Sequence, residues 1–159
     1  MVWSPPRARS PIGCSVDQRP AEVEDRLIAG HYEGDLILGA GNRSAVGVFV
    51  ERTTRYTMFC HLPHKDAQSV REAFTRRLAA DLGLQVFFCL PHSPWEHGTC
   101  ESQNGCIRHY LPKGSDLSTV SYQQLSAYQQ MLNERPRKIL GWKSPAQLFK
   151  QLISNLDSN

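Results

Sequence analysis

The sequence predicts a single mixed α/β domain in which three strands are followed by a helix, a fourth strand and further helices. Short runs rich in Val, Ile and Phe at residues 31–38, 44–51 and 55–62 indicate the first three strands. Residues 66–82 instead repeat apolar side chains every three or four positions, which is the period of a helix. At 159 residues, of which 40% are hydrophobic, the chain is long enough to bury one core.

The predicted strands are separated by short polar segments. Glycine-rich residues 39–42 end the first strand, and residues 52–55 are few enough to form a hairpin between the second and the third. The fourth strand, residues 85–89, is a brief apolar run that ends before a proline-containing loop. We expect these segments to form the mixed sheet of the domain.

The first predicted helix occupies residues 66–82. Asp66 is suited to be its N-cap, and Gly83 stands where a C-terminal stop is expected. Its apolar stripe is made up of Ala67, Val70, Phe74, Leu78 and Leu82. A second helix is predicted at residues 96–110, ending before Pro112.

Two more helices are predicted near the C-terminal end. Residues 121–134 have one apolar side, and the last helix begins at Ser144 and Pro145, a capping residue followed by a proline at the first helical position. The apolar side of residues 121–134 is expected to consist of Tyr122, Leu125, Tyr128, Met131 and Leu132.

The ends of the chain differ from the domain between them. Residues 1–20 are rich in Pro, Arg and Ser and have no hydrophobic period, so we expect an irregular leader. The core is expected to span residues 21–155, followed by a frayed tail at residues 156–159.

Charge and composition narrow the class of protein. Residues 102–150 hold seven Lys or Arg against two acids, which suits a polyanionic partner, although a solvated basic face explains the charge alone equally well. No apolar run approaches the ~18 residues of a membrane span, and the start lacks a secretory signal, so we expect a cytoplasmic protein. Five irregularly spaced cysteines predict free thiols, and the glycine patterns of phosphate and dinucleotide loops are absent.

Two carboxylates are candidates for a divalent-metal site. Asp35 lies within the first strand, where an acid is costly unless it is paired, exposed at an edge or bound to a cation. Glu101 lies near the start of the helix predicted at residues 96–110. Mg²⁺ uses few protein carboxylates and leaves room for water and phosphate oxygens, and two such ions assist phosphoryl transfer. Judged by spacing alone, two surface acids remain the simpler interpretation.

A zinc site is an alternative interpretation of the neighbouring residues. The pairs Cys89/His92 and His97/Cys100, together with Cys106, offer the right kinds of ligand. The loop between the two pairs is shorter than zinc modules usually have, and it contains Pro94. We therefore favour incidental packing for these side chains.

Three blocks of the sequence resemble one family of enzymes. Residues 91–95 read Pro-His-Ser-Pro-Trp, residues 112–114 read Pro-Lys-Gly, and Glu101 and Asn104-Gly105 stand between them at the spacing of an Asn-Glu-Asn-x-Asn-Gly motif. These features, with His-Tyr-Glu-Gly-Asp-Leu-Ile at residues 31–37 and Asn-Glu-Arg-Pro-Arg-Lys at residues 133–138, resemble the insertion-sequence family thirty of bacterial transposases. The resemblance runs in order from about residue 15 onward.

The resemblance implies an RNase-H-like fold that cuts DNA ends and joins them to a target with Mg²⁺ or Mn²⁺. It makes Asp35 the first catalytic, metal-binding carboxylate and Glu101 the last. The family also has a second aspartate, in a Thr-Trp-Asp-Gln-Gly block on a further strand followed by a helix. Only Gly83 and Leu84 remain where that block is expected, so this domain is expected to lack one strand and one helix and to be catalytically inactive. Asp66 and Asp81 are poor substitutes by position.

The resemblance also implies DNA as the partner, and the basic C-terminal third supplies candidate phosphate contacts at Arg108, Lys113, Arg137, Lys138 and Lys143. A competing hypothesis is a non-catalytic fragment that binds DNA, or that pairs with itself or with full-length transposase as an inhibitor. Near Glu101 the chain departs from the family pattern at four positions, where the family usually has Asp, Arg, Asn and Asn; these are Leu90, His97, Cys100 and Ser102.

Overall fold

The computed structural model shows a sheet with helices on its faces. It describes residues 2–4, 14–15, 31–62, 69, 72–73, 85–88 and 98–156. The strands are β1 (Val2–Ser4), β2 (Cys14–Ser15), β3 (Tyr32–Leu38), β4 (Ala45–Glu51), β5 (Thr57–His61) and β6 (Gln85–Phe88). The α-helices are α2 (Gly98–Ile107), α3 (Tyr122–Glu134) and α4 (Pro145–Leu156), and short 3-10 helices span Ala40–Asn42, Leu117–Thr119 and Lys138–Leu140.

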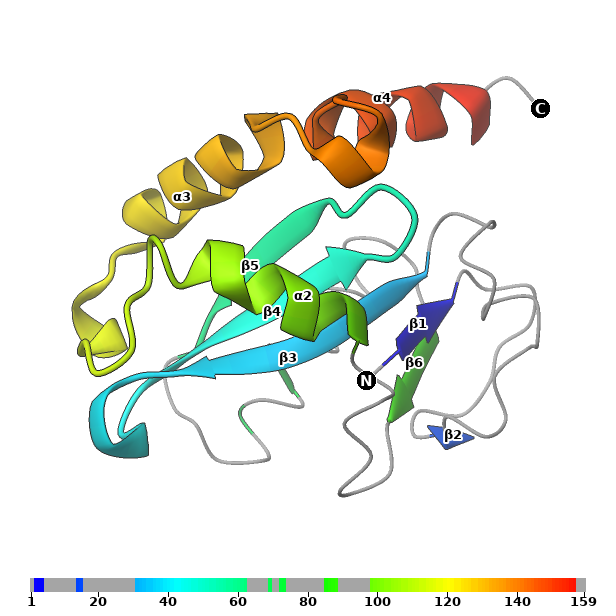
Figure 1. Cartoon of the computed structure of the whole chain (residues 1–159). Helices are drawn as coiled ribbons and strands as arrows, with labels where there is room; N and C mark the ends of the chain where they lie inside the picture. Colours follow the sequence, from blue (N-terminus) through cyan, green and yellow to red (C-terminus); the bar gives the residue numbers. More distant parts are fainter. Residues whose placement is uncertain are drawn as a thin grey trace.

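The described strands form one mixed sheet in the order β2-β6-β1-β3-β4-β5. Strands β3, β4 and β5 form an antiparallel meander, β1 is antiparallel to both β3 and β6, and β2 is parallel to β6. Figure 1 shows α2 lying across the face of β3 and β4, with α3 and α4 beyond β5. No helix among the described residues is long and apolar enough to cross a membrane.

Most of the expected elements are confirmed. Strands β3 to β6 and helices α2, α3 and α4 all fall within a few residues of their predicted bounds, so the mixed α/β class is correct. Of the helix predicted at residues 66–82, only Ser69, Glu72 and Ala73 are described, and these three are helical. The predicted cap of α4 is also present, because the backbone N–H of Gln147 donates to Ser144 Oγ at 3.2 Å.

Residues 1–20 differ from the irregular leader that the composition suggested. Within them, β1 lies between β3 and β6, with Val2 opposite both Glu33 and Phe87. The backbone groups of two neighbouring strands would otherwise lack a partner at this point, and pairing with β1 satisfies them. A strand of three residues shows no period in sequence, so its position is set by the strands on either side of it.

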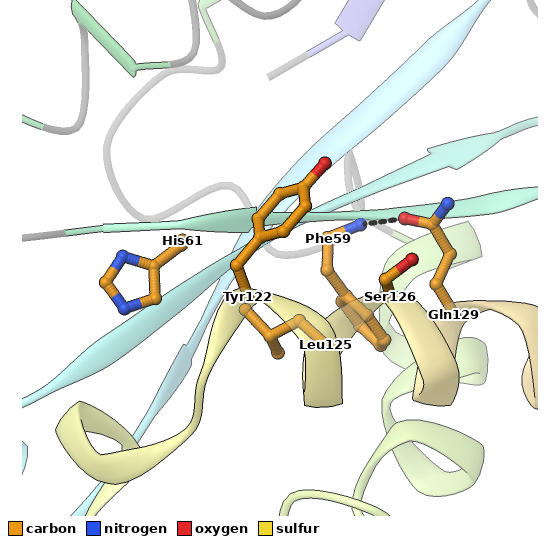
Figure 2. A pocket seen from close by; sticks show the side chains of 6 residues that line it. All are labelled: Phe59, His61, Tyr122, Leu125, Ser126 and Gln129. Carbon is orange, nitrogen blue, oxygen red and sulfur yellow. Dashed lines mark hydrogen bonds between the residues drawn. The ribbon is translucent and has the colours of Figure 1, made fainter.

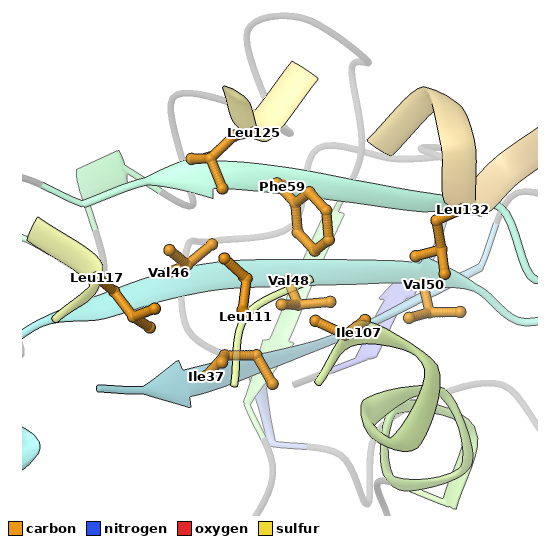
Figure 3. Packing of buried hydrophobic residues seen from close by; sticks show 10 residues of the cluster. All are labelled: Ile37, Val46, Val48, Val50, Phe59, Ile107, Leu111, Leu117, Leu125 and Leu132. Atoms are coloured by element: carbon orange, nitrogen blue, oxygen red, sulfur yellow. The ribbon is translucent and has the colours of Figure 1, made fainter. Parts of the chain in front are cut away.

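The main hydrophobic core lies between the sheet and helices α2 and α3 (Figure 3). It contains Ile37, Val46, Val48, Val50, Phe59, Ile107, Leu111, Leu117, Leu125 and Leu132. A second cluster on the other face of the sheet includes Phe49 and Met58, and Tyr56 stacks on Phe149 of α4 with ring centroids 4.2 Å apart. All of β4 is buried because both of its faces are covered, which explains its continuous apolar run.

Helix α3 covers the outer edge of the sheet through two amide side chains. The N–H of Phe59 donates to Gln129 Oε1 at 2.9 Å (Figure 2), and the N–H of Thr57 donates to Asn133 Oδ1 at 2.8 Å. Asn133 Nδ2 also donates to the carbonyl oxygen of Thr57 at 2.7 Å. Edge strands need such cover, because their outward N–H and C=O groups have no strand to pair with.

This arrangement corrects the apolar side predicted for α3. Leu125 and Leu132 are buried, but Tyr122 and Met131 are 71% and 55% exposed. The helix is rotated because the edge of β5 requires hydrogen-bonding side chains, which Gln129 and Asn133 supply. A small hollow lies between α3 and β5 (Figure 2), lined by Phe59, His61, Tyr122, Leu125, Ser126 and Gln129.

Replacing Asn133 is expected to destabilise the domain. Asn133 is 2% exposed, and Asn133→Ala leaves both the N–H and the C=O of Thr57 without their partner in a buried position. We expect a loss of about 2 kcal/mol in the free energy of unfolding, measured by urea denaturation. Glu134→Ala, at an exposed position next to it, is the control and should change stability by less than about 0.5 kcal/mol. Equal stabilities of the two variants would contradict this role.

Candidate functional site

The carboxylate of Asp35 faces helix α2. Asp35 lies in the middle of β3, on the same face as the buried Ile37, because alternate residues of a strand share a face. Its Oδ1 accepts the N–H of Leu36 at 2.8 Å, and its Oδ2 accepts Nδ2–H of Asn104 at 3.1 Å. The half-buried side chain is therefore held by one bond from its own strand and one from α2.

Two contacts fix the position of α2 along β3. Asn104 meets Asp35, and one turn later Arg108 Nη1 donates to the carbonyl oxygen of Leu38 at 3.1 Å. The rotation of the helix is fixed on another side, where Gln103 is 3% exposed and its Nε2 donates to Thr57 Oγ1 at 2.9 Å. Helix α2 thus runs along β3 with a defined face turned toward it.

Glu101 stands on this face of α2. It precedes Asn104 by three residues, and residues three apart lie on the same side of a helix. The structure describes the backbone of Glu101 but not its side chain, so the distance between the two predicted carboxylates falls outside the described atoms. The backbone of α2 nevertheless brings residues 35 and 101, which are 66 positions apart in the chain, to the same side of the sheet.

The donors at this place suit a hard divalent cation. Carboxylate and amide oxygens are the protein ligands that Mg²⁺ prefers, usually in small numbers. Among the described residues no group of three or more His, Cys, Asp or Glu side chains could hold a metal ion. Of the residues considered for zinc, Cys89, His92 and His97 lie outside the described residues, and Cys106 Sγ accepts a hydrogen bond from Arg137 Nη1 at 3.2 Å.

A buried ion pair lies near the N-terminal end of β3. Glu33 and Arg52 are 1% and 6% exposed, and Arg52 Nε is 3.0 Å from Glu33 Oε1. Beside them, the buried carboxylate of Glu51 accepts hydrogen bonds from the backbone N–H and the hydroxyl of Thr54. Burial raises the pKa of the Tyr32 hydroxyl well above its ordinary value, and the negative charge of Glu51 adds to this shift. Both acids therefore have structural partners: Glu33 pairs with Arg52, and Glu51 binds Thr54 in the turn between β4 and β5.

Two of the five cations predicted to contact DNA are bonded inside the protein. Arg108 Nη1 binds the carbonyl oxygens of Leu38 and Leu111. Arg137 Nη1 donates to Gln103 Oε1 at 3.2 Å as well as to Cys106, and its Nη2 donates to the carbonyl oxygen of Leu132 at 3.3 Å. These half-buried arginines join elements of the fold, a role that the sequence does not reveal because both belong to an otherwise exposed basic segment.

The three lysines of that set are exposed, and two of them lie in the connection between α3 and α4. This connection, residues 135–143, carries Lys138 and Lys143 together with Ile139 and Trp142, which are 74% and 70% exposed. Several backbone hydrogen bonds hold it, including Trp142 N–H to the Arg137 carbonyl at 2.9 Å. Gly141 and Trp142 both have positive φ, 60° and 66°, so an aromatic residue is held in a conformation that favours glycine.

Comparison with known proteins finds several transposases. The chain is 44% identical to the transposase for insertion sequence element IS1086 of Cupriavidus metallidurans, over 94% of this chain and 51% of that protein. It is 34% identical to the transposase InsI for insertion sequence element IS30A of Escherichia coli, over 91% of this chain and 44% of that protein. A putative integrase of a Spiroplasma virus is 26% identical over 78% of this chain.

The chain spans about half the length of the curated relatives it matches. No family model and no solved structure matches it. The alignment with the IS1086 protein has 174 positions, yet 94% of this 159-residue chain is only about 149 residues, so about 25 residues of the relative have no counterpart here. The alignment with InsI has 170 positions and covers 91% of this chain, which is about 145 residues. About 25 residues of InsI therefore also have no counterpart here.

Proposed function

This chain is a homologue of the transposases of IS30-family insertion sequences over more than nine-tenths of its length, and from this relationship we propose that it is the catalytic domain of a DNA transposase. Its substrates are the phosphodiester bonds of transposon ends and target DNA. Asp35 and Glu101 are the metal-binding carboxylates, and the fold is RNase-H-like, with the antiparallel β3-β4-β5 meander as its first part.

The structural observation that carries the proposed site is the hydrogen bond between Asn104 and Asp35. It ties the helix that bears Glu101 to the strand that bears Asp35, although nothing in their spacing along the chain requires it. The contact of Arg108 with the end of β3 keeps the helix in line with the strand. Two acids that a DNA-cutting site would use therefore come from adjoining elements.

The residues present fit Mg²⁺ or Mn²⁺. Asp35 and Glu101 would hold the ion, which when bound would activate the attacking oxygen and stabilise the leaving oxygen of a scissile phosphate. Asp35 is restrained by its bonds to Leu36 and Asn104, so its carboxylate is oriented before any ion arrives. Such orientation lowers the cost of assembling the site.

We propose that the domain is inactive as it stands. The second aspartate of the family belongs to a block of which this chain has no copy, and the absence of about 25 aligned residues supports a deletion of that size. With two of the three carboxylates, the site binds one cation less tightly and cannot hold two cations in position. Asp66 and Asp81, considered as substitutes, lie outside the described residues.

Removing the carboxylate of residue 35 is expected to weaken Mn²⁺ binding by tenfold or more, because an ionised oxygen ligand is replaced by a neutral amide. Asp35→Asn keeps the shape of the side chain. Isothermal titration calorimetry and the electron paramagnetic resonance of free Mn²⁺ measure the affinity. Glu134→Gln, which neutralises an exposed acid on α3, is the control and should bind as the unaltered chain does. Equal affinities of the two variants would exclude a cation site at Asp35.

A second candidate function is DNA binding without catalysis, including inhibition of a full-length transposase or of another copy of this chain. The observation that favours it is the 135–143 connection, in which exposed cations flank an exposed Trp142 on a hydrogen-bonded backbone. Lysines contact phosphates, and an exposed aromatic ring stacks on accessible bases. Lys113 extends the set of exposed cations.

Neutralising both lysines of the connection is expected to weaken DNA binding and its salt dependence. The plot of log affinity against log salt concentration has a negative slope. For Lys138→Ala/Lys143→Ala this slope should become less steep by about 2, because two phosphate contacts are lost. Gel-shift titrations at several salt concentrations measure the slope. Lys150→Ala removes an exposed lysine on α4 and is the matched control. An unchanged slope in the double variant would place DNA elsewhere on the surface.

A further inference from the structure

The amide oxygen of Asn104 is the most unusual polar atom near the predicted metal site. Asn104 Nδ2 donates to Asp35 Oδ2, and since a carboxylate can only accept, the orientation of the amide follows from this bond. The other end of the amide, Oδ1, is buried and has no hydrogen-bond partner among the described residues. Buried oxygens without a partner are rare in folded proteins, and a bound ion is one of the reasons for them.

The place of this oxygen along α2 supports a role in the site. Asn104 stands one helical turn after Glu101, on the same face, and directly contacts Asp35. It is therefore in contact with Asp35 and one helical turn from the backbone position that bears Glu101. A neutral amide oxygen is an accepted ligand for hard divalent ions, and it adds no negative charge beside Asp35.

The rest of the helix explains why Asn104 cannot turn away. Its neighbour Gln103 is bonded to Thr57 and Arg137, and Ile107 is fully buried in the main core. Ile107, one helical turn after Asn104, and Gln103, on the adjacent side of α2, together fix the rotation of the helix and leave residue 104 facing β3. The backbone at Asn104 is thus held rigidly enough to present the amide oxygen of this residue in a defined position.

We propose that Asn104 is an oxygen ligand of the divalent cation, standing between Asp35 and Glu101. This inference rests on the proposed metal site and adds a residue to it. In this chain the site has two carboxylates and one amide, which gives it enough oxygens to bind an ion but less negative charge than three carboxylates provide. The ligand is a hard divalent cation, Mg²⁺ or Mn²⁺.

The test measures Mn²⁺ affinity and the rise in unfolding temperature caused by Mn²⁺, neither of which depends on catalytic activity. Asn104→Ala is expected to weaken binding tenfold or more and to reduce the rise in temperature. Asn104→Asp keeps the shape, adds a carboxylate oxygen, and is expected to bind at least as tightly as the unaltered chain. Gln123→Ala removes an exposed amide on α3 and is the control. Circular dichroism in EDTA checks that each variant folds.

The outcomes separate this inference from the proposed function. If Asp35→Asn loses Mn²⁺ binding but Asn104→Ala binds within twofold of the unaltered chain, the metal site stands and Asn104 is not a ligand. If Asn104→Asp is as weak as Asn104→Ala, the residue acts only by donating its N–H to Asp35, which also overturns the inference. If the unaltered chain binds no more Mn²⁺ than Asp35→Asn, the proposed site itself is wrong.

Discussion

Returning the missing segment is expected to turn this domain from inactive to active. The experiment uses the full-length IS1086 transposase, in which the region aligned with this chain is replaced by the chain itself. This chimaera should give no detectable joining of labelled transposon ends to target DNA. Inserting the relative's unmatched segment of about 25 residues at the deletion, expected between residues 82 and 85, should raise joining roughly a thousandfold or more.

The size of this effect follows from charge in the site. Cations held over a scissile phosphate supply several kcal/mol of transition-state stabilisation, and each 1.36 kcal/mol is a factor of ten in rate. A missing carboxylate removes part of that term and also leaves the attacking and leaving oxygens poorly oriented. The expected gain therefore combines the second aspartate with the strand that positions it.

The controls distinguish catalysis from folding. The repaired chimaera carrying Asp35→Asn should remain inactive although it is complete. The unrepaired chimaera should still bind transposon ends, because the relative supplies the rest of its chain. Joining by the unrepaired chimaera at the rate of the parent transposase would show that the chain needs no second aspartate.

The sequence predicted the elements whose signals are local. Helix α3 begins after Ser121, which forms a capping box with Gln124, and α4 begins with the Ser144-Pro145 pair. Strands β3 and β4 were visible as apolar runs closed by turn residues. Strand β1 was not predicted, because its position depends on pairing with β3 and β6 and three residues show no periodicity.

The site was predicted less completely than the fold. Asp35 stood out because an acid within a strand is costly, and Asp35 and Glu101 were joined as candidates because their blocks resemble a transposase family. Asn104 and Gln103 were overlooked, since the role of an amide depends on its partners and not on its own pattern. A signal was present: Asn104 stands three residues after Glu101 and three before Ile107, on a helix whose apolar content is low.

The internal contacts of the two arginines could not be predicted for a related reason. The sequence alone does not distinguish an arginine that contacts a phosphate from one that donates to a carbonyl oxygen within the fold. Arg137 joins the end of α3 to α2, which only the three-dimensional contacts reveal. Lys138 and Lys143, in the hydrogen-bonded connection after it, are exposed.

Breaking the ion pair between Glu33 and Arg52 is expected to have the largest effect on stability. The two side chains are 2% and 7% exposed, respectively, so neither charge is well solvated. Arg52→Met keeps the apolar stem but leaves the carboxylate of Glu33 buried without its guanidinium. Removing one member of a buried pair costs about 3–5 kcal/mol, which is a large part of the total stability of a small domain.

A double variant separates the cost of taking the Arg52 guanidinium away from Glu33 from the net contribution of the ion pair to stability. Glu33→Leu/Arg52→Met removes both charges, and since apolar residues of similar volume often replace buried pairs without loss, it should recover most of the stability. Urea denaturation measures the free energy of unfolding of the unaltered chain, Arg52→Met and the double variant, with one slope against urea concentration fitted to all three. If the double variant is as unstable as Arg52→Met alone, the pair itself holds β3 against the turn between β4 and β5. In that case the ion pair, more than apolar packing, determines how this end of the Asp35 strand is anchored.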